Sequence, residues 1–440
     1  MNYPKVFIFG QPFNNFSGGG ITLTNLFKGW DKNKIAVAYL GHGLYNVTTD
    51  VCDTVYQLGQ EEYKWIFPFN LLQRKFPSGL KTFNPDKKPS FFLIDRGIRY
   101  KIVNRIFYPF LRWIGLYHCL SKIYLSQRLK TWLNDYKPDI LYLQVSTRED
   151  IQFSVDLINL LKKPSVIHIM DDWPTTICNG SIFKKYWQKK IDRELKNLMN
   201  LVDLHLSISD SMSDEYSKRY NKRFIAFHNP IETEKWLPYS KKDYTIKNDK
   251  VVILYSGRIG MGIKESIYEV AAAIDKIDRS EFDIRLHIQT PTRNESVLNQ
   301  LKKFRFIVIN PFVSLDQLPK IFSDADLLLL ANDFSSHGAD YLKLSMPTKA
   351  SEYMISGTPI FAYSPAEAAV SKFFNTHECA YCVHKQDQTE IIKAVKFMLS
   401  NEDYRKKIGS KAVEVAKENF SALKVRAEFQ RLLIKAVNKD

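Results

Sequence analysis

Short apolar segments alternate with longer amphipathic segments along almost the whole chain, and this alternation limits the folds that the chain can adopt. The apolar segments are rich in Ile, Val, Leu and Phe. Uninterrupted apolar runs of this length are typical of strands buried on both faces of a parallel sheet, with helices as connections. In the first part of the chain they are residues 5–9, 35–40, 140–145, 165–170, 204–208 and 224–227. The pattern predicts an α/β fold built from βαβ units.

A polar stretch without clear periodicity, residues 229–250, interrupts the alternation and is interpreted as a linker. The alternation restarts with residues 251–256, 282–288, 306–309, 327–330 and 381–383. We therefore expect two Rossmann-like domains, each with a doubly wound parallel sheet, over residues 1–235 and 245–419. In such folds ligands bind beyond the carboxyl ends of the strands. Where two such domains face each other, the ligand binds in the cleft between them.

The overall charge narrows the class of partner. The 440 residues carry a formal net charge of +16, which favours an anionic partner such as nucleic acid, a membrane surface or a phosphorylated substrate. No apolar run approaches the roughly 18 residues that a membrane span needs, and the first residues lack the apolar core of a signal peptide. Five cysteines, an odd number, favour a reducing, cytoplasmic setting.

The stretch 343–360 predicts a loop, a short helix and a buried strand. Pro347 and Thr348 suit the start of a helix, and Gly357 suits its end. The free N–H groups of a helix start attract phosphate, Lys349 adds a full charge, and Glu352, one turn later, is placed to accept hydrogen bonds from a ribose. An ordinary capped helix is the alternative interpretation.

Two glycine-containing turns follow strands. After the first strand, Gly18, Gly19 and Gly20 precede a helix that contains Thr22, and they allow a ligand to approach the backbone. A plain flexible loop is the alternative, because the spacing is not that of the dinucleotide-binding motif.

The second turn opens the second domain. Gly257 and Arg258 end a strand, and Lys264 lies in the first turn of the next helix. Two cations at this edge of a sheet suit a diphosphate whose charge rises as it leaves. Solvated surface charges are the alternative.

Two further clusters suggest other chemistry. His168, Asp171 and Asp172 end a first-domain strand and are placed to act as an acid or base or to bind a substrate hydroxyl, although a histidine in an apolar run is often a core residue. Adjacent residues on an extended backbone point apart, so Asp171 and Asp172 are a poor metal site. Cys379 and Cys382, with two histidines nearby, lack a second half-site and favour a half-buried strand over zinc.

The segment 96–137 is basic and aromatic. It contains nine Lys or Arg and one acidic residue, and Ile102, Ile106, Phe110 and Trp113 fall at helical spacing. Such a segment fits docking on an anionic membrane. It fits equally a helix that packs on its own domain and leaves its cations in solvent.

With these motifs in place, the chain resembles the retaining glycosyltransferases of family 4, which have the GT-B fold of two Rossmann-like domains. The resemblance rests on the Gly-rich first turn, on Gly257-Arg258 with Lys264, on Ser345 to Glu352 followed by Gly-Thr-Pro-Ile, and on the closing helices after residue 404. It implies that a last helix, about 420–440, packs back on the first domain. The sequence departs from the family at Ser345, where a glutamate that contacts the donor sugar is usual.

The resemblance implies a function. Arg258, Lys264 and the helix start at residues 347–349 would hold a nucleotide-diphosphate sugar without a metal or other cofactor, with Gly19, Gly20 and Gly257 close to the donor. His168 and Thr22 would lie on the acceptor side, and Asp171 and Asp172 near the reacting hydroxyl. The acceptor would be a glycan or a polyprenyl-diphosphate-linked sugar in bacterial capsule or lipopolysaccharide assembly, reached from the cytoplasm. Alternatives are a sugar-nucleotide epimerase and a catalytically silent binding subunit; a nucleic-acid-binding protein is disfavoured because no such module is present.

Overall fold

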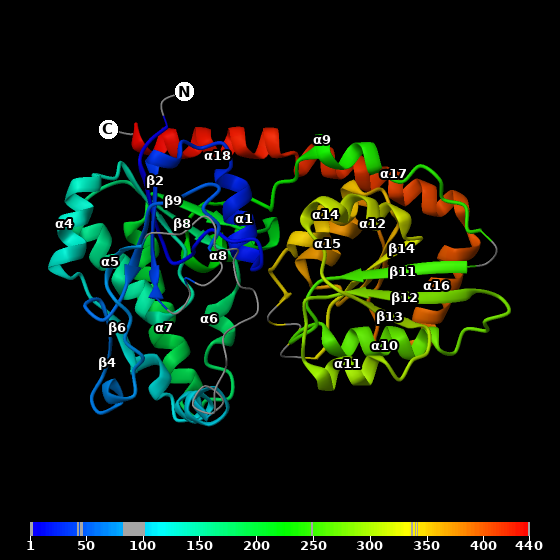
Figure 1. The fold of residues 1–440 in the computed structure, drawn as a ribbon, viewed down its shortest axis with the longest axis horizontal. Coiled ribbons are helices and arrows are strands. Elements are labelled where there is room, and N and C mark those ends of the chain that lie inside the picture. The colour runs from blue at the N-terminus through cyan, green and yellow to red at the C-terminus, as the bar shows by residue number, and fades with distance from the viewer. Residues whose placement is uncertain are drawn as a thin grey trace. The chain divides into compact units, whose positions relative to one another are not determined.

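Two β-sheets, one mainly and one entirely parallel, carry most of the apolar core, one in each of the two units into which the chain divides. The computed structural model describes residues 3–41, 44, 47–81, 102–247, 250–335, 338, 340 and 342–438. The first unit is Met1–Phe227 with Arg426–Asp440, and the second is His228–Val425. The chain thus returns to its first unit after completing the second (Figure 1).

The first unit is built on an eight-stranded sheet in the order β10-β9-β8-β7-β1-β2-β3-β5. Its strands are β1 (Val6–Phe9), β2 (Ile35–Leu40), β3 (Val55–Leu58), β5 (Gly79–Lys81), β7 (Ile140–Leu143), β8 (Ser165–Ile169), β9 (Leu204–Ser207) and β10 (Phe224–Ala226). All neighbours pair in parallel except β3 and β5. Every residue of β1, β7 and β8 is buried, because helices cover both faces. The strand order reverses between β1 and β7.

The helices of this unit follow the strands as predicted. They are α1 (Gly18–Phe27), α4 (Gln127–Tyr136), α5 (Arg148–Leu161), α6 (Trp173–Thr176), α7 (Lys184–Leu201), α8 (Asp210–Tyr220) and α18 (Ala422–Val437). Local sequence sets their starts: Thr147 and Asp150 form a reciprocal capping box at α5, and Ser209 caps α8. Phe429 of α18 packs on Phe27 and Tyr142, with ring centroids 5.1 and 6.0 Å apart.

An appendage between β3 and β7 lies outside the predicted alternation. It contains a two-stranded antiparallel sheet, β4 (Tyr63–Trp65) with β6 (Ser121–Ile123), and the short helical segments η3 (Phe69–Leu71), η4 (Val103–Phe107), α3 (Tyr108–Trp113) and η5 (Leu116–Cys119). The buried Glu62 fastens it to the sheet. Its carboxylate accepts hydrogen bonds from the hydroxyls of Tyr56, Ser78 and Ser126 and from the N–H of Gly59.

The second unit contains a six-stranded, entirely parallel sheet in the order β13-β12-β11-β14-β15-β16. The strands are β11 (Lys250–Ser256), β12 (Asp283–Gln289), β13 (Ile307–Asn310), β14 (Leu327–Ala331), β15 (Ile360–Tyr363) and β16 (Tyr381–Val383). The helices are α10 (Lys264–Ile274), α11 (Glu295–Leu301), α12 (Leu318–Asp324), α14 (Thr348–Ile355), α15 (Ala369–His377), α16 (Gln388–Ser400) and α17 (Glu402–Asn419). The order reverses between β11 and β14, which makes that point the topological switch where such sheets bind ligands.

The stretch 229–250 differs from the linker that we predicted. It belongs to the second unit and contains α9 (Thr233–Trp236) and η6 (Leu237–Tyr239). Trp236 is buried with its ring 5.7 Å from that of Phe322. Lys241 Nζ donates to the carbonyls of Ser323 and Ala325 at 3.1 and 2.9 Å. Trp236 and Lys241 therefore hold this segment, which is polar on average, against the second unit. Among the described helices, none is both long and apolar enough to cross a membrane.

Candidate functional site

The switch point of the second unit brings the two predicted motifs of that unit together. The chain leaves β11 through Gly257, whose φ is +141°. A Cβ atom at this position would lie 3.4 Å from Lys349 Nζ and 3.4 Å from the Tyr255 hydroxyl oxygen. The backbone after β11 therefore runs directly beside the lysine of α14, and a glycine suits both the conformation and the close approach.

Lys349 is the most unusual group at this edge. Its Nζ is buried and makes no hydrogen bond to any described residue. It lies 4.0 Å from the centroid of the Tyr255 ring and 5.9 Å from that of Tyr353, so aromatic faces are its main neighbours. Burial lowers the pKa of Lys349 to about 7, and the charge of Glu352 opposes the shift. An ammonium group has three donors, and because no described residue accepts from them, they are free to bind an anion.

Glu352, one turn further along α14, shows the complementary behaviour. Burial raises the pKa of its carboxyl to about 7, and Lys349 opposes that shift. Each of the two groups is therefore penalised for carrying its charge, and only partly compensated by the other. A ligand that offers phosphate to the cation and hydroxyls to the carboxylate would relieve both penalties.

Arg258 and Lys264 lie beyond the same strand end. Arg258 is exposed, and its carbonyl accepts a hydrogen bond from the Tyr255 hydroxyl at 2.6 Å. Lys264 is the first residue of α10, its side chain is partly exposed, and its Nζ lies 3.2 Å from Glu265 Oε1 and 5.4 Å from the Tyr268 ring centroid. Both cations can thus reach a ligand without breaking a buried interaction.

Asp333, which the sequence analysis did not select, fixes the start of α10. One carboxylate oxygen accepts from the N–H of Ser266 at 2.8 Å, and the Asp333 N–H donates to Gly262 O at 2.8 Å. The Ser266 hydroxyl donates to the Asn332 carbonyl at 2.8 Å. Residues that follow β14 thereby cap the helix that carries Lys264, since Ile263 at its N-cap position has no capping side chain. The signal was an Asn-Asp pair directly after an apolar run.

The remaining predicted residues of this unit lie around α14. Ser345 is buried, and its N–H donates to Leu342 O at 3.2 Å. Pro347 occupies the N-cap position and Thr348 is the first helical residue, with no side-chain cap. The helix therefore begins at the predicted pair, with proline rather than threonine at the N-cap position. Gly357, with φ of +71°, follows its end as predicted.

In the first unit, the Gly-rich turn lies at the point where β1 and β7 adjoin. Ser17 caps α1 by accepting from Gly20 N at 3.1 Å, and Asn14 accepts from Ser17 N at 2.9 Å. A Cβ on Gly20 would lie 2.2 Å from the Asn14 amide nitrogen, and one on Gly19 would lie 3.1 Å from the Gln11 amide oxygen. Packing within the turn therefore explains both glycines without a ligand.

Two polar atoms next to this turn are buried without a hydrogen-bond partner among the described residues: Thr22 Oγ1 on α1 and Gln144 Nε2 after β7. Sequence reasoning selected Thr22 and missed Gln144. Unsatisfied buried polar atoms are unusual and call for an explanation such as a ligand.

The three residues of the predicted acid or base cluster, His168, Asp171 and Asp172, have different surroundings in the structure. His168 lies inside β8, 1% exposed, with Nδ1 hydrogen-bonded to the Tyr142 hydroxyl, as expected for a core histidine. Asp172 is buried and accepts from Tyr216 at 2.8 Å and from both terminal nitrogens of Arg219 at 2.9 and 3.3 Å. Asp171 is half-buried. Asp172 thus joins α6 to α8, and Asp171 is the more accessible carboxylate.

The cysteine motif has a structural role. Cys379 is buried against the Met354 sulfur, and burial raises the pKa of the Cys379 and Cys382 thiols to about 12. Within the described part of the chain, no group of three or more His, Cys, Asp or Glu is arranged to hold a metal.

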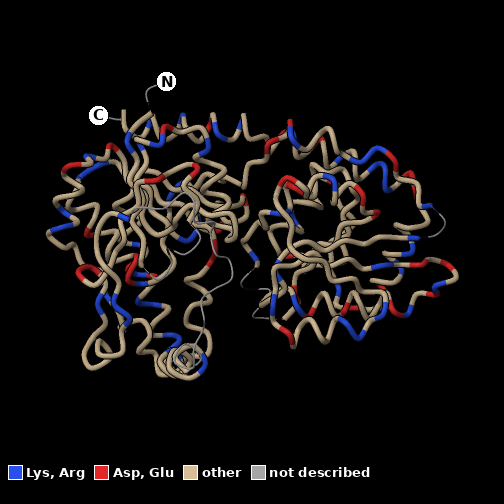
Figure 2. Tube along the Cα trace, in the orientation of Figure 1, with Lys and Arg blue, Asp and Glu red and all other residues tan. Residues whose placement is uncertain are grey.

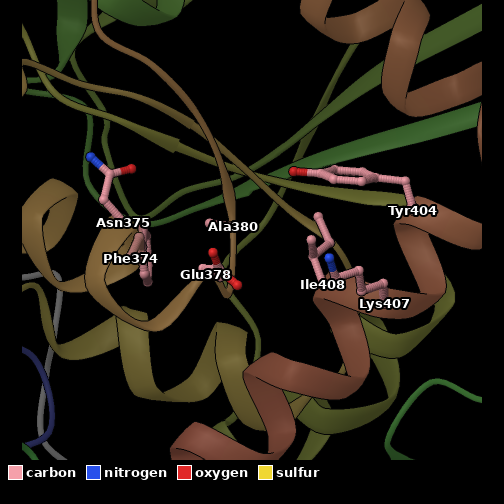
Figure 3. A pocket seen from close by; sticks show the side chains of 7 residues that line it. All are labelled: Phe374, Asn375, Glu378, Ala380, Tyr404, Lys407 and Ile408. Atoms are coloured by element: carbon pink, nitrogen blue, oxygen red, sulfur yellow. The ribbon is translucent and has the colours of Figure 1, made fainter.

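A cavity of about 250 Å³ lies elsewhere in the second unit (Figure 3). It is lined by Phe374, Asn375, Glu378, Ala380, Tyr404, Lys407 and Ile408. Ala380 precedes β16, so the cavity lies at the amino edge of the sheet. It is therefore separate from the groups around Gly257, which lie at the carboxyl edge.

Comparison with solved structures shows the fold. The chain is similar to sucrose-phosphate synthase from Thermosynechococcus elongatus, with a TM-score of 0.63, 11% identity and 98% coverage of both chains. It is similar to Anabaena HepE in complex with UDP-glucose, with a TM-score of 0.60, 11% identity and coverage of 98% of this chain and 100% of that one. It is also similar to WaaG, a glycosyltransferase involved in lipopolysaccharide biosynthesis, with a TM-score of 0.57, 11% identity and coverage of 97% of this chain and 99% of that one.

The chain has the GT-B fold. Residues 250–401 also match the family described as Glycosyl transferases group 1, and no match was found among curated protein sequences. The matched range contains Gly257, Lys349 and Glu352, and the family match together with the GT-B fold supports a glycosyltransferase. The fold predicted from the sequence is confirmed. Family 4 and retention of configuration stay predictions.

Proposed function

We propose that this protein transfers a sugar from a nucleoside-diphosphate donor to a glycan or lipid-linked acceptor, with retention of anomeric configuration. The observation that carries the proposal is the ammonium group of Lys349, which is buried without a hydrogen bond to any described residue and lies beside Gly257 at the switch point of the second sheet. A diphosphate at this edge would supply the missing acceptors. Proteins of the same fold include HepE, whose structure contains UDP-glucose, and WaaG, which is involved in lipopolysaccharide biosynthesis. A role in cell-surface polysaccharide assembly is part of the proposal.

The donor groups divide by chemistry. Glu352 would accept hydrogen bonds from the ribose, and Lys349 with the start of α14 would bind phosphate oxygens. Arg258 and Lys264 would stabilise the charge that develops on the leaving diphosphate, a role that cations can fill without a divalent metal. Asp333 would act as a positioning residue, because it holds the first turn of α10, which carries Lys264.

The reaction would proceed on one face of the sugar. The bond between the anomeric carbon and the phosphate oxygen breaks, and the acceptor oxygen bonds to the same face. The acceptor proton passes to the departing phosphate. On the first unit, Thr22 Oγ1 and Gln144 Nε2 would bind hydroxyl groups of the acceptor, and Asp171 would orient the hydroxyl that reacts. His168 and Asp172 would support that edge of the sheet rather than touch substrate.

Ligand binding and product analysis test the proposal in sequence. A thermal-shift screen with UDP, GDP, ADP and CMP should identify the nucleotide. Sugars attached to that nucleotide are then tested as donors by measuring release of the free nucleotide. Release that requires an acceptor supports transfer, whereas a changed sugar without an acceptor would indicate an epimerase. Binding without any turnover would indicate a silent subunit, which Ser345 in place of glutamate makes worth testing. Proton NMR of the product reports its anomeric configuration.

A further inference from the structure

The appendage of the first unit presents large apolar side chains to solvent. In the helical segment formed by η4 and α3, Ile102, Ile106, Phe110 and Trp113 are each at least half exposed, whereas Leu111 is buried. The spacing of four, four and three residues places the exposed side chains along one stripe. These four side chains therefore do not pack on their own domain, whereas Leu129 and Leu133, in the α4 part of the predicted segment, are buried in it. Residues 96–101 of the predicted segment lie outside the described residues.

Two more segments extend this stripe into a surface. Phe67, two residues before η3, and Leu71 of η3 are 79% and 76% exposed. Phe69 of η3 packs on Phe107 of η4, with ring centroids 5.5 Å apart. At the other end of α3, the N–H of Ile182 donates to the Trp113 carbonyl at 2.9 Å. Ile182, Phe183 and Tyr186 are all more than half exposed. We call the exposed apolar residues of these three segments the apolar surface.

The segments that form and adjoin the apolar surface carry cations and no acidic residues. Residues 63–81, 102–126 and 179–191 contain no Asp or Glu. They contain eleven cations, Lys64, Arg74, Lys75, Lys81, Arg105, Arg112, Lys122, Lys184, Lys185, Lys189 and Lys190. In Figure 2 the end of the first unit that carries β4 and the start of α7 shows blue segments with hardly any red. A cluster of exposed apolar residues is a candidate interaction site, and the surrounding cations select an anionic partner.

We propose that the apolar surface docks the protein on a lipid bilayer that contains anionic headgroups. Long apolar side chains on a helix that lies flat, bordered by Lys and Arg and lacking acids, match the interface of such a bilayer, where the apolar groups enter the acyl boundary and the cations meet phosphate. The docking goes beyond the proposed glycosyl transfer and does not depend on it. If both hold, an acceptor carried on a lipid would be presented at the surface on which the first unit lies.

Vesicle sedimentation with the full chain tests the proposal in the absence of any sugar nucleotide. The protein should bind vesicles of phosphatidylglycerol and phosphatidylcholine, bind phosphatidylcholine alone far more weakly, and dissociate when salt is raised. Each Lys near an anionic surface is worth roughly fivefold in partitioning, so Lys184→Ala with Lys185→Ala should lower binding about 25-fold. The matched control is Lys302→Ala with Lys303→Ala, an adjacent exposed pair in the second unit.

The apolar contribution has its own variant pair. Ile106→Ser with Phe110→Ser should lower vesicle binding at least about tenfold, because each removes an apolar side chain that would be buried on docking. Leu423→Ser, at a position 76% exposed, is the control and should bind normally. All variants should keep the far-ultraviolet circular dichroism and melting temperature of the parent, since the changed side chains are exposed.

Three outcomes would overturn the docking proposal: equal binding to neutral and anionic vesicles, no binding to either, or equal losses in the surface variants and their controls. A dimer in size-exclusion chromatography that Ile106→Ser with Phe110→Ser dissociates would assign the surface to a second copy instead, and would also overturn it. Binding of the nucleotide found by thermal shift should be unchanged in Lys184→Ala with Lys185→Ala. Failure of docking and failure of the proposed function are therefore separate results.

Discussion

Replacing Lys349 by methionine removes the buried ammonium group while keeping an unbranched apolar side chain of similar length. The lysine destabilises the unliganded protein, because burial lowers its pKa from 10.5 to about 7. That difference corresponds to an upper bound of about 5 kcal/mol against the charged form. The methionine side chain carries no charge and has no such penalty. Unliganded K349M should therefore be more stable than the parent, and it should bind the nucleoside diphosphate less well.

The sign of the stability gain depends on pH. The folded-state pKa of Lys349 is below its unfolded value, so its destabilisation is fully present below about pH 7 and disappears as pH rises towards 10.5. Glu352 has a folded-state pKa of about 7, above its unfolded value of 4.5, so its destabilisation is fully present above about pH 7 and absent below 4.5. In K349M the Glu352 carboxylate also loses the cation whose charge opposes the rise of its pKa. The gain from K349M should therefore be largest near pH 5 and shrink, or reverse, near pH 9.

Calorimetry can separate these effects. A gain of 1 kcal/mol in a unit of this size raises the melting temperature by about 2–4 °C, and the transition that shifts on adding the nucleotide identifies the second unit. Loss of one charge-assisted hydrogen bond of about 1.5–3 kcal/mol should weaken diphosphate binding roughly 10- to 150-fold in isothermal titration. A variant that melts lower at pH 5 and binds the nucleotide normally would refute the reasoning, because Lys349 would then be a structural residue.

Three other predictions concern different parts of the molecule. Arg258→Ala and Lys264→Ala should each lower turnover about 10²–10³-fold with little change in melting temperature, since both side chains reach solvent; two variants of near-normal turnover would contradict the assignment. Asp172→Asn should destabilise the first unit by on the order of 3 kcal/mol, because it breaks the paired contact to Arg219. Nucleotide binding should stay intact, and an unchanged denaturant unfolding curve would exclude a structural role for Asp172. Glu62→Ala leaves the hydroxyls of Tyr56, Ser78 and Ser126 without their acceptor, so limited proteolysis should cut the appendage faster than in the parent, and an identical cleavage rate would argue against Glu62 as its anchor.

The alternation of apolar and amphipathic segments was enough to predict both parallel sheets, because strands covered on both faces leave a strong local signal. It was not enough for β3, β5 or the β4–β6 pair. Gln57 of β3 is buried, and its side-chain amide donates to Pro77 O, 20 residues further along the chain, at 2.6 Å. A local sequence pattern cannot predict such a contact. The appendage is likewise held by Glu62, a residue that composition alone would place at the surface.

The candidate site could be predicted where its residues are close in sequence. Gly257, Arg258, Lys349 and Glu352 lie in two short motifs, each recognisable by itself. Asp333 and Gln144 belong to the same strand edges, but only because β14 adjoins β11 and β7 adjoins β1. Strand order is set by the packing of the whole sheet, so these residues could not be selected from periodicity. Asp172 was misjudged for the same reason, since its partner Arg219 is 47 residues further along.

The return of the chain to its first unit at Arg426 has a consequence for how the protein is made. Residues 1–227 leave the ribosome well before Phe429, whose ring packs against Phe27, Tyr142 and Phe227. Part of the apolar core of the first unit therefore stays exposed until the second unit, continuous from His228 to Val425, has been synthesised. The second unit is accordingly the part to express alone. A fragment that ends at residue 227 should require residues 426–440, supplied as a peptide or by circular permutation, to remain in solution.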